Sequence, residues 1–287
     1  MHRRRTAVLI AFAILSLAPL SCGRGGQPVA QSTTPVPTAS ATQPAATPTP
    51  VPSRSTATPA PRPTPSRTSS PRPFPPGLSG KDIERIPTDR PVVALTFDAG
   101  ANADGVPAIL AMLAREHVPA TFFLTGDFTL QFPDAVRSIA RGGYRLANHS
   151  FSHPHFPTLT DAQIRAQLTD TEAAVGDVTG ATTRPLFRFP YGDRTAHTIA
   201  VVNAQGYVAV RWTVDSLGWQ GTSGGGSTAS VTQRVLGAAR PGEIVLMHVG
   251  SHPTDRSTLD ADALPGIIAG LRQRGYTFVT LDALLTG

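Results

Sequence analysis

The sequence has a single cysteine, Cys22, and no acidic residue in its first 80 positions. One cysteine cannot form an internal disulfide, so the chain is not a disulfide-stabilised scaffold and another use of Cys22 is expected. Residues 1–80 hold eight of the 25 basic residues, which leaves 17 basic against 19 acidic residues in the remainder. The remainder therefore has no basic surplus, and we expect no binding to nucleic acid.

The first 22 residues have the pattern of an export signal. Arg3, Arg4 and Arg5 precede an apolar run over residues 6–20, which suits a signal peptide and is short for a membrane-spanning helix. The run leads to Cys22, so the segment resembles a bacterial lipoprotein signal, although Pro19 stands where Leu is usual. An ordinary cleaved signal and an uncleaved anchor are the alternatives. All three predict that the rest of the chain is extracytoplasmic, either secreted or held at a membrane by a lipid on Cys22.

Residues 23–77 consist largely of Pro, Thr, Ser and Ala, with almost no large apolar residue. This composition cannot bury enough apolar surface to offset the entropy lost on ordering, so we expect a disordered linker. The linker could be a tether that holds a domain off the membrane or a simple spacer. Residues 78–287 are expected to form one domain.

In residues 78–287, short β-branched or aromatic runs alternate with helical patterns, which indicates an α/β fold with a parallel sheet. The expected strands cover residues 92–97, 121–124, 145–148, 186–189, 207–212, 244–248 and 277–280. The expected helices cover residues 104–116, 133–141, 161–178, 195–205, 230–239 and 263–274. No internal repeat is apparent.

Reactive side chains lie at the carboxyl ends of these strands. Asp98, His149, Arg188, Asp215 and His248 each end an expected strand or follow one closely. In parallel α/β barrels this edge of the sheet carries the active site. The positions therefore predict one shared site.

His149 and His153 are four residues apart, a spacing that lets two imidazoles hold one divalent transition metal from a single segment. Pro154 and His155 favour a loop rather than a regular helix here. A chance pair is the alternative.

Asp98, Arg188 and His248 each have a catalytic and a structural interpretation. Asp98 could take a proton from a bound water or cap the following helix. Arg188 could hold Asp98 ionised or form a purely structural salt bridge. His248 could protonate a leaving amine near neutral pH or be a satisfied core histidine.

Five ordered motifs make residues 90–287 resemble the polysaccharide deacetylases of the NodB-homology type, carbohydrate esterase family 4. The motifs are Thr96–Gly100, His149–His153, Arg188–Gly192, Asp215–Trp219 and Leu246–His248. The resemblance implies a distorted (β/α) barrel in a single domain. It also implies Asp98 as catalytic base with Arg188 as its partner, His248 as general acid, and His149 and His153 as ligands of a divalent metal, zinc or alternatively cobalt.

Two positions depart from the family's pattern. Ala99 replaces a metal-binding Asp of the first motif, and a methyl group cannot coordinate a cation. Gly218 replaces the Asp that precedes the tryptophan of the fourth motif and tunes the general-acid histidine in the family. Asn102 or Asp104 could supply a ligand from the next loop, and Asp215 could replace the carboxylate missing at position 218.

Substrate contacts are expected from Pro190, Tyr191, Trp219 and Leu246. The rings of Tyr191 and Trp219 could face a sugar or pack into the wall, and the backbone amide of Tyr191 could stabilise an oxyanion. The glycine-rich residues 221–226 and the acidic residues 251–262 are expected to form rim loops. An Asp from the second loop could enter the metal site.

The resulting hypothesis is a hydrolase of non-peptide carbon–nitrogen bonds that removes acetyl groups, with a metal, from an extracytoplasmic glycan. Its substrate would be peptidoglycan, an N-acetylglucosamine polymer or chitin oligomers, with acetylated xylan as the outlier, and the chain is expected to be monomeric. A glycan-binding module on a weakened deacetylase fold is the alternative, motivated by Ala99 and Gly218. A metal-independent amidohydrolase of the same fold would not need the pair His149 and His153.

Overall fold

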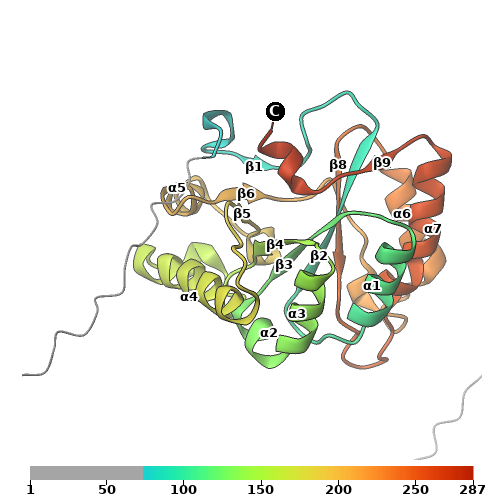
Figure 1. Ribbon diagram of the computed structural model, residues 1–287, viewed down its shortest axis with the longest axis horizontal. Helices are drawn as coiled ribbons and strands as arrows, with labels where there is room; N and C mark the ends of the chain where they lie inside the picture. Colours follow the sequence, from blue (N-terminus) through green and yellow to red (C-terminus); the bar gives the residue numbers. More distant parts are fainter. Residues whose placement is uncertain (1–73, 287) are drawn as a thin grey trace, which may run out of the picture. The chain divides into compact units, whose positions relative to one another are not determined.

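The computed structural model describes residues 74–286; the expected export signal, with Cys22, and most of the expected linker lie outside the described residues. Strands in this range form one parallel sheet with the order β1-β6-β5-β4-β3-β2-β8-β7, and β9 pairs with β2 (Figure 1). The strands are β1 (Asp82–Ile83), β2 (Val92–Ala99), β3 (Ala120–Leu124), β4 (Arg145–Asn148), β5 (Leu186–Phe187), β6 (Val208–Val210), β7 (Val214–Asp215), β8 (Glu243–His248) and β9 (Thr277–Phe278).

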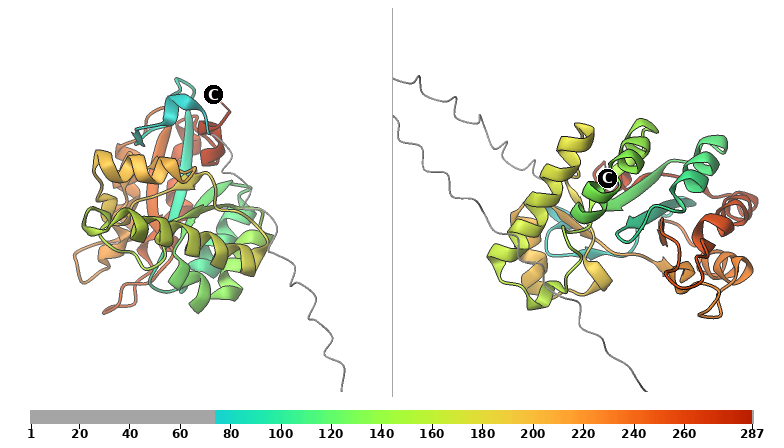
Figure 2. Two further views of the ribbon diagram at one scale, coloured as in Figure 1. Left: turned by 90° about the vertical axis from the view of Figure 1, so that its left-hand side faces the viewer. Right: turned by 90° about the horizontal axis from the view of Figure 1, so that it is seen from below.

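Helices follow the outer side of this sheet. They are α1 (Val106–Arg115), α2 (Gly126–Gln131), α3 (Pro133–Arg141), α4 (Asp161–Thr179), α5 (Ala196–Ala204), α6 (Thr228–Gly237) and α7 (Leu259–Gln273). Figure 2 (right) shows α4, α3, α1 and the α6–α7 pair succeeding one another around a curved sheet. None of the helices in residues 74–286 has both the length and the apolar character that a membrane crossing requires. The predicted distorted (β/α) barrel is thus confirmed, in the form of a curled half-barrel.

The starts of three helices are set by local hydrogen bonds. Capping boxes close the N-termini of α4, α5 and α6, from Thr160, Thr195 and Ser227 respectively. Each hydroxyl accepts a backbone N–H of the first helical turn that would otherwise lack a partner. These boxes explain why α4 and α5 begin where the sequence predicts, to within one residue.

All the expected strands and helices are present, although several ends differ. Strands β5 and β6 stop at Phe187 and Val210, short of the predicted ends at 189 and 212. The short elements β1, β7 and α2 were not predicted because two to six residues are too few to show a periodic pattern.

Helix α7 corrects the predicted rim loop over residues 251–262. The helix begins at Leu259 rather than 263, so Asp260 and Asp262 lie in its first turn. Carboxylates are stabilised at this end of a helix by the partial positive charge of its free N–H groups. The acidic stretch expected to form a solvated loop therefore includes the first turn of a helix.

Strand β2 is buried along its whole length and separates two environments. Phe97 and Ala99 pack into the large apolar cluster beneath the outer helices. Ala94 belongs to a second cluster on the inner face, and Asp98 lines a cavity. The alternation of strand side chains thus points Asp98 and position 99 to opposite faces of the sheet.

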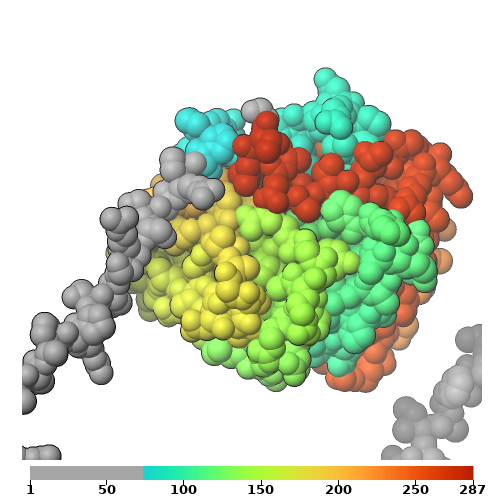
Figure 3. Space-filling view, viewed as in Figure 1, coloured from blue at the N-terminus to red at the C-terminus, as the bar shows by residue number. Residues whose placement is uncertain are grey.

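The inner face is closed at one end by the two ends of the described chain. Leu78 and Ile83 pack there with Leu281 and Leu284 in the second cluster. Figure 3 shows the C-terminal segment (red) lying beside the residues around position 80 (cyan). Because apolar side chains fill this amino-terminal end of the strands, the opposite, carboxyl end is left for polar side chains and a cavity.

Glu243 begins β8 and carries a carboxyl group that is fully buried. Neither of its carboxyl oxygens has a hydrogen-bond partner within residues 74–286. Burial raises the pKa of Glu243 to about 7, against smaller opposing effects from Arg240 and Arg274. In the unfolded chain the group ionises near pH 4.3, so the wild type loses stability as the pH rises from there to about 7.

The variant Glu243→Gln is therefore expected to become more stable, relative to wild type, as the pH increases. Its free energy of unfolding relative to wild type should rise by up to about 3 kcal/mol between pH 4 and pH 8, since one pKa unit corresponds to about 1.4 kcal/mol. Urea unfolding at both pH values measures the change. Asp170→Asn, at an exposed position of α4, is the control and should show no such trend. An equal effect of Glu243→Gln at both pH values would contradict the argument.

Candidate active site

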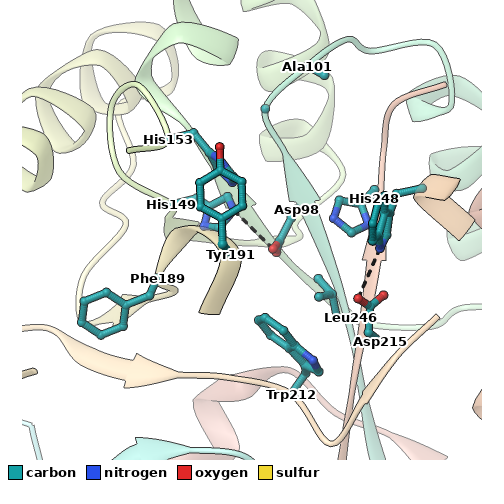
Figure 4. Close-up of a pocket in the computed structure, with 12 residues that line it drawn as sticks. Asp98, Ala101, His149, His153, Phe189, Tyr191, Trp212, Asp215, Leu246 and His248 are labelled. Atoms are coloured by element: carbon teal, nitrogen blue, oxygen red, sulfur yellow. Dashed lines mark hydrogen bonds and ion pairs between the residues drawn. The ribbon is translucent and has the colours of Figure 1, made fainter. Parts of the chain in front are cut away.

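A cavity of about 630 Å³ opens at the carboxyl end of the strands (Figure 4). Its volume is in the range of ordinary small-ligand sites. It is lined by Asp98, Gly100, Ala101, His149, His153, Phe189, Tyr191, Trp212, Asp215, Trp219, Leu246 and His248. Most of the residues predicted from the sequence therefore surround one cavity.

Arg188 lies behind the cavity wall and is fully buried. Its Nη1 donates to Asp98 Oδ1 at 2.7 Å and to Thr96 Oγ1 at 2.9 Å. Its other nitrogens donate to the carbonyls of Val210, at 3.3 Å, and Arg211, at 2.9 Å. The guanidinium also lies 4.0 Å from the centre of the Phe123 ring. Arg188 thus joins β2 to the ends of β5 and β6.

Asp98 is the carboxylate at the centre of the site. Burial raises the pKa of Asp98, but Arg188 and then His149 and His248 oppose this, and the net pKa lies below its usual value. The carboxylate is 6% exposed, so it contacts the cavity without being open to bulk water. It is therefore ionised near neutral pH and held in one orientation by Arg188.

His149 follows β4 directly and has a defined tautomer. Its Nδ1 lies 2.9 Å from the backbone carbonyl of Arg188, so Nδ1 carries the proton and donates. Its Nε2 then presents a lone pair toward Asp98 Oδ2, 3.3 Å away. Burial lowers the pKa of His149, so the ring is neutral near pH 7. Two lone pairs that face each other at this distance favour a cation beside them.

His153 completes the pair that the sequence indicated. Its ring centre lies 4.9 Å from that of His149 and 4.5 Å from that of Tyr191. Burial, and then the neighbouring His149, lowers the pKa of His153 to about 4. Both imidazoles are therefore neutral near pH 7 and can act as ligands.

The loop between these histidines is anchored from two sides. Gln167 of α4 accepts the backbone N–H groups of Phe151 and Ser152 at 2.7 and 2.9 Å. The Phe151 ring packs so closely on Gly126 that a Cβ atom there would lie 2.1 Å from it. Glycine at position 126 thus permits the packing that holds the loop in place.

His149 and His153 are suited to binding a metal ion, although with few protein ligands. Within residues 74–286 no group of three or more His, Cys, Asp or Glu side chains has the arrangement of a metal site. Ala99 faces the outer core and supplies no ligand. The two imidazoles of His149 and His153 remain as donors. Catalytic zinc sites usually have three protein ligands, so weaker binding is expected here.

The suggestion that Asn102 or Asp104 could replace the missing ligand is wrong. Asn102 exchanges hydrogen bonds with the backbone of Ser251, at 2.8 and 3.0 Å. Asp104 accepts from the Ser251 hydroxyl and pairs with Arg256. Both side chains tie the loop before α1 to the loop after β8, and neither lines the cavity.

His248 ends β8 next to Asp260, an aspartate of the predicted second rim loop that does not line the cavity. Asp260 of α7 accepts the backbone N–H of His248 at 2.8 Å, and its Oδ2 lies 3.7 Å from the ring Nδ1. The suggestion that Asp215 stands in for the missing carboxylate at 218 is not supported. Asp215 instead accepts from the backbone N–H of Leu217, at 2.9 Å, and from Trp219 Nε1, at 3.2 Å.

Two aromatic side chains flank the cavity and remain open to solvent. Tyr191 is 61% exposed, on the short turn Pro190–Gly192, and Trp219 is 49% exposed, on the turn Gly218–Gln220. Pro190 is buried and does not line the cavity, so a direct contact with substrate is not supported by its position. Trp212 and Phe189 line the cavity but were not predicted, although both stand at the ends of predicted strands.

Backbone strain is concentrated around this cavity. Ser150, His153, Tyr191 and Leu217 all have φ between 58° and 69°, which non-glycine residues rarely adopt. Each lies in a loop that carries a side chain of the site. Such conformations persist only where surrounding contacts hold them, and they are typical of functional sites.

Comparisons with known proteins agree with this geometry. Residues 85–210 match the polysaccharide deacetylase family. The chain is 34% identical over 198 residues to a peptidoglycan-N-acetylglucosamine deacetylase of Bacillus cereus, covering 69% of this chain and 70% of that protein. It is 31% identical over 208 residues to a chitooligosaccharide deacetylase of Sinorhizobium fredii, covering 70% and 95%.

Among solved structures, the fold is similar to that of BA3943 of Bacillus anthracis, a pseudoenzyme of carbohydrate esterase family 4. The TM-score is 0.65 at 28% identity, over 72% of this chain and 69% of that protein. A mutant of BA3943 has restored enzymatic activity. The sequence identity to the deacetylases, over most of their length, decides the assignment: this chain is a member of the polysaccharide deacetylase family of the NodB-homology type.

Proposed function

We propose that this chain is a metal-assisted deacetylase that hydrolyses acetamido groups of an extracytoplasmic glycan. The observation that carries the proposal is the pairing of β2 with β8, in which Asp98 and His248 are direct neighbours. One buried carboxylate and one partly exposed imidazole thus meet at a single cavity, next to two neutral histidines. This is a base, an acid and a pair of metal ligands in contact with the same space.

Asp98 acts as the general base. Arg188 keeps the carboxylate ionised and oriented, so that Asp98 can take a proton from the attacking water. The water oxygen forms a bond to the acetyl carbon, and the carbonyl oxygen becomes an oxyanion. The backbone N–H of Tyr191, in its strained turn, is the donor proposed for that oxyanion.

His248 acts as the general acid. Its imidazolium donates a proton to the amide nitrogen as the carbon–nitrogen bond breaks, which releases acetate and leaves the sugar amine. Its side chain is 31% exposed and can reach a bound substrate. In the same reaction, Asp98 therefore accepts a proton and His248 donates one.

His149 and His153 would hold a divalent metal, zinc or alternatively cobalt. When bound, such an ion polarises a carbonyl and lowers the pKa of a bound water. The neutral imidazoles suit either ion. The loss of a carboxylate ligand at Ala99 makes the site more positive by one charge and is expected to weaken metal affinity.

The proposed substrates are peptidoglycan, an N-acetylglucosamine polymer or chitin oligomers. The deacetylases of known substrate to which the chain is similar act on peptidoglycan or chitooligosaccharides, as their names state. The exposed rings of Tyr191 and Trp219 both line the cavity and offer apolar surface to a pyranose. A lipid anchor at Cys22 would hold the domain, as a monomer, close to a cell wall.

A glycan-binding module on a weakened deacetylase fold is the second candidate. Ala99 favours it, as does the similarity to a pseudoenzyme of the same family. The presence together of Asp98, Arg188, His149, His153 and His248 favours the enzyme, because a module that only binds glycan needs none of these groups.

The full-length chain, stripped with a chelator and resupplied with zinc or cobalt, is expected to deacetylate N-acetylglucosamine oligomers. His149→Ala should abolish metal-dependent activity and metal binding, since it removes one of two imidazole ligands. Acetate release and metal titration measure the two effects. His197→Ala is the matched control, because His197 is exposed on α5 and pairs with Asp161.

Two results would contradict this expectation. Activity that survives both chelation and His149→Ala would exclude a role for the metal pair. An absence of activity on every acetylated glycan, with the oligomers still bound by a folded protein, would select the binding module.

Trp219→Ala tests the sugar-stacking role of the exposed indole. We expect KM for the oligomers to rise about tenfold, corresponding to roughly 1.4 kcal/mol of binding, with kcat changed less than about threefold. Steady-state kinetics separates the two parameters. Leu130→Ala, at an exposed position on α2, should leave both unchanged, and an unchanged KM in Trp219→Ala would assign the ring to wall packing.

Cys22→Ala tests the proposed lipid anchor. In a bacterial host that processes lipoproteins, the wild-type chain is expected to incorporate labelled palmitate and to fractionate with membranes. The variant should lose the label because it lacks the acceptor thiol. Equal labelling of both proteins would exclude Cys22 as the attachment site.

A further inference from the structure

The space beside Gly218 is filled by a side chain from another part of the fold. A Cβ atom at position 218 would lie 2.3 Å from Oδ1, 2.5 Å from Cγ and 2.9 Å from Oδ2 of Asp260. No side chain at 218 could coexist with Asp260 in this position. Glycine is therefore required here for the close approach of a carboxylate, and the carboxyl group of Asp260 occupies the volume of a residue-218 side chain.

Asp260 faces His248 from this position. It is 3% exposed, at the start of α7, and its Oδ2 accepts the backbone N–H of His248 at 2.8 Å. The same oxygen lies 3.7 Å from the ring Nδ1. Both Nδ1 of His248 and Oδ1 of Asp260 are buried, and neither finds a hydrogen-bond partner elsewhere in the described part of the chain. The two unpaired atoms thus belong to adjacent groups.

We propose that Asp260 is the positioning residue of the general acid His248, and that it reaches this role through the space left by Gly218. The proposal rests on the deacetylase function proposed above. A slight rotation of the imidazole brings Nδ1–H within hydrogen-bond distance of the Asp260 carboxylate. Catalytic hydrogen bonds are often long in the absence of substrate and shorten when it binds.

This contact would serve the reaction in two ways. It fixes the ring so that the Nε2 proton points into the cavity, toward the leaving nitrogen. It also stabilises the imidazolium before that proton is given up, while Nδ1 keeps its own proton.

The charges around His248 support this assignment. Burial lowers the pKa of His248, but Asp260 first, and then Asp98 on β2 and Asp215 on β7, outweigh burial, so the net pKa is raised. The cationic form of His248 in turn disfavours charge on His149 and His153. Asp260 is the closest carboxylate to the ring, and Asp215 is already bound to Leu217 and Trp219.

A purely structural role for Asp260 is the competing explanation, since its carboxylate also holds the backbone of β8. Asp260→Asn separates the two roles. Asparagine keeps an oxygen that can accept the His248 N–H, but it carries no charge for the imidazolium. Asp262→Asn is the matched control, because Asp262 lies in the same helical turn and is exposed.

The variants are compared by kcat, KM and pH profile on N-acetylglucosamine oligomers. In Asp260→Asn we expect kcat to fall about tenfold or more with little change in KM, because general-acid catalysis contributes about 10²–10⁴-fold. Since His248 must be protonated, activity is lost as the pH rises through its pKa, and this limb should move to lower pH by about one unit. Asp262→Asn should leave the profile unchanged.

A carboxylate exchange provides the second test. Gly218→Asp alone should be inactive or misfolded, because two side chains would share one space. The double variant, Gly218→Asp combined with Asp260→Ala, should be at least about tenfold more active than Asp260→Ala alone. An unchanged kcat and pH profile in Asp260→Asn, or a folded double variant no better than Asp260→Ala, would overturn the proposal.

The pKa of His248 measured by NMR keeps this test independent of the proposed activity. It should fall by about one unit in Asp260→Asn and stay constant in Asp262→Asn, whether or not the wild type is a deacetylase. An inactive wild type with this shift would reject the function but retain the pairing. An unchanged pKa of His248 would reject the pairing itself.

Discussion

The buried ion pair between Asp98 and Arg188 is the interaction on which the rest of the site depends. Two charges taken out of water are tolerated only when they are paired and hydrogen-bonded, and removing one of them typically costs about 3–5 kcal/mol. Arg188 meets this requirement by binding Asp98, Thr96 and two strand-end carbonyls. Its own backbone carbonyl then sets the tautomer of His149. Through its guanidinium and its backbone carbonyl, Arg188 thus organises the ends of β2, β4, β5 and β6.

The two ends of the half-barrel differ: one is filled by apolar packing and the other carries the candidate site. Apolar side chains from both ends of the described chain fill the amino-terminal side, around Leu78 and Leu281. The carboxyl side carries the cavity, and four non-glycine residues in the loops that line it have positive φ. Contacts outside the cavity maintain these backbone conformations, such as the hydrogen bond that Gln167 accepts from the loop after His149.

The two departures from the family's pattern have different consequences. Ala99 packs into the outer core, and no other acidic or histidine side chain in residues 74–286 takes over as a third ligand. Gly218, in contrast, opens a space that Asp260 fills from a different element. A carboxylate thus lies beside His248 although a different element supplies it, whereas within residues 74–286 none takes the place of the one absent at position 99. The same family pattern can be lost at one residue and rebuilt at another.

The amino-acid sequence determined the succession of strands and helices and the placement of Asp98, His149, Arg188 and His248 at strand ends, because periodic burial and motif spacing act within short segments. Tertiary structure alone decided that Asp260 meets His248, that Asn102 and Asp104 turn toward the loop after β8, and that Trp212 lines the cavity. These outcomes depend on strand register, on the curvature of the sheet and on where α7 begins. No local sequence pattern predicts these contacts, because each contact joins residues that come together only when separate elements pack.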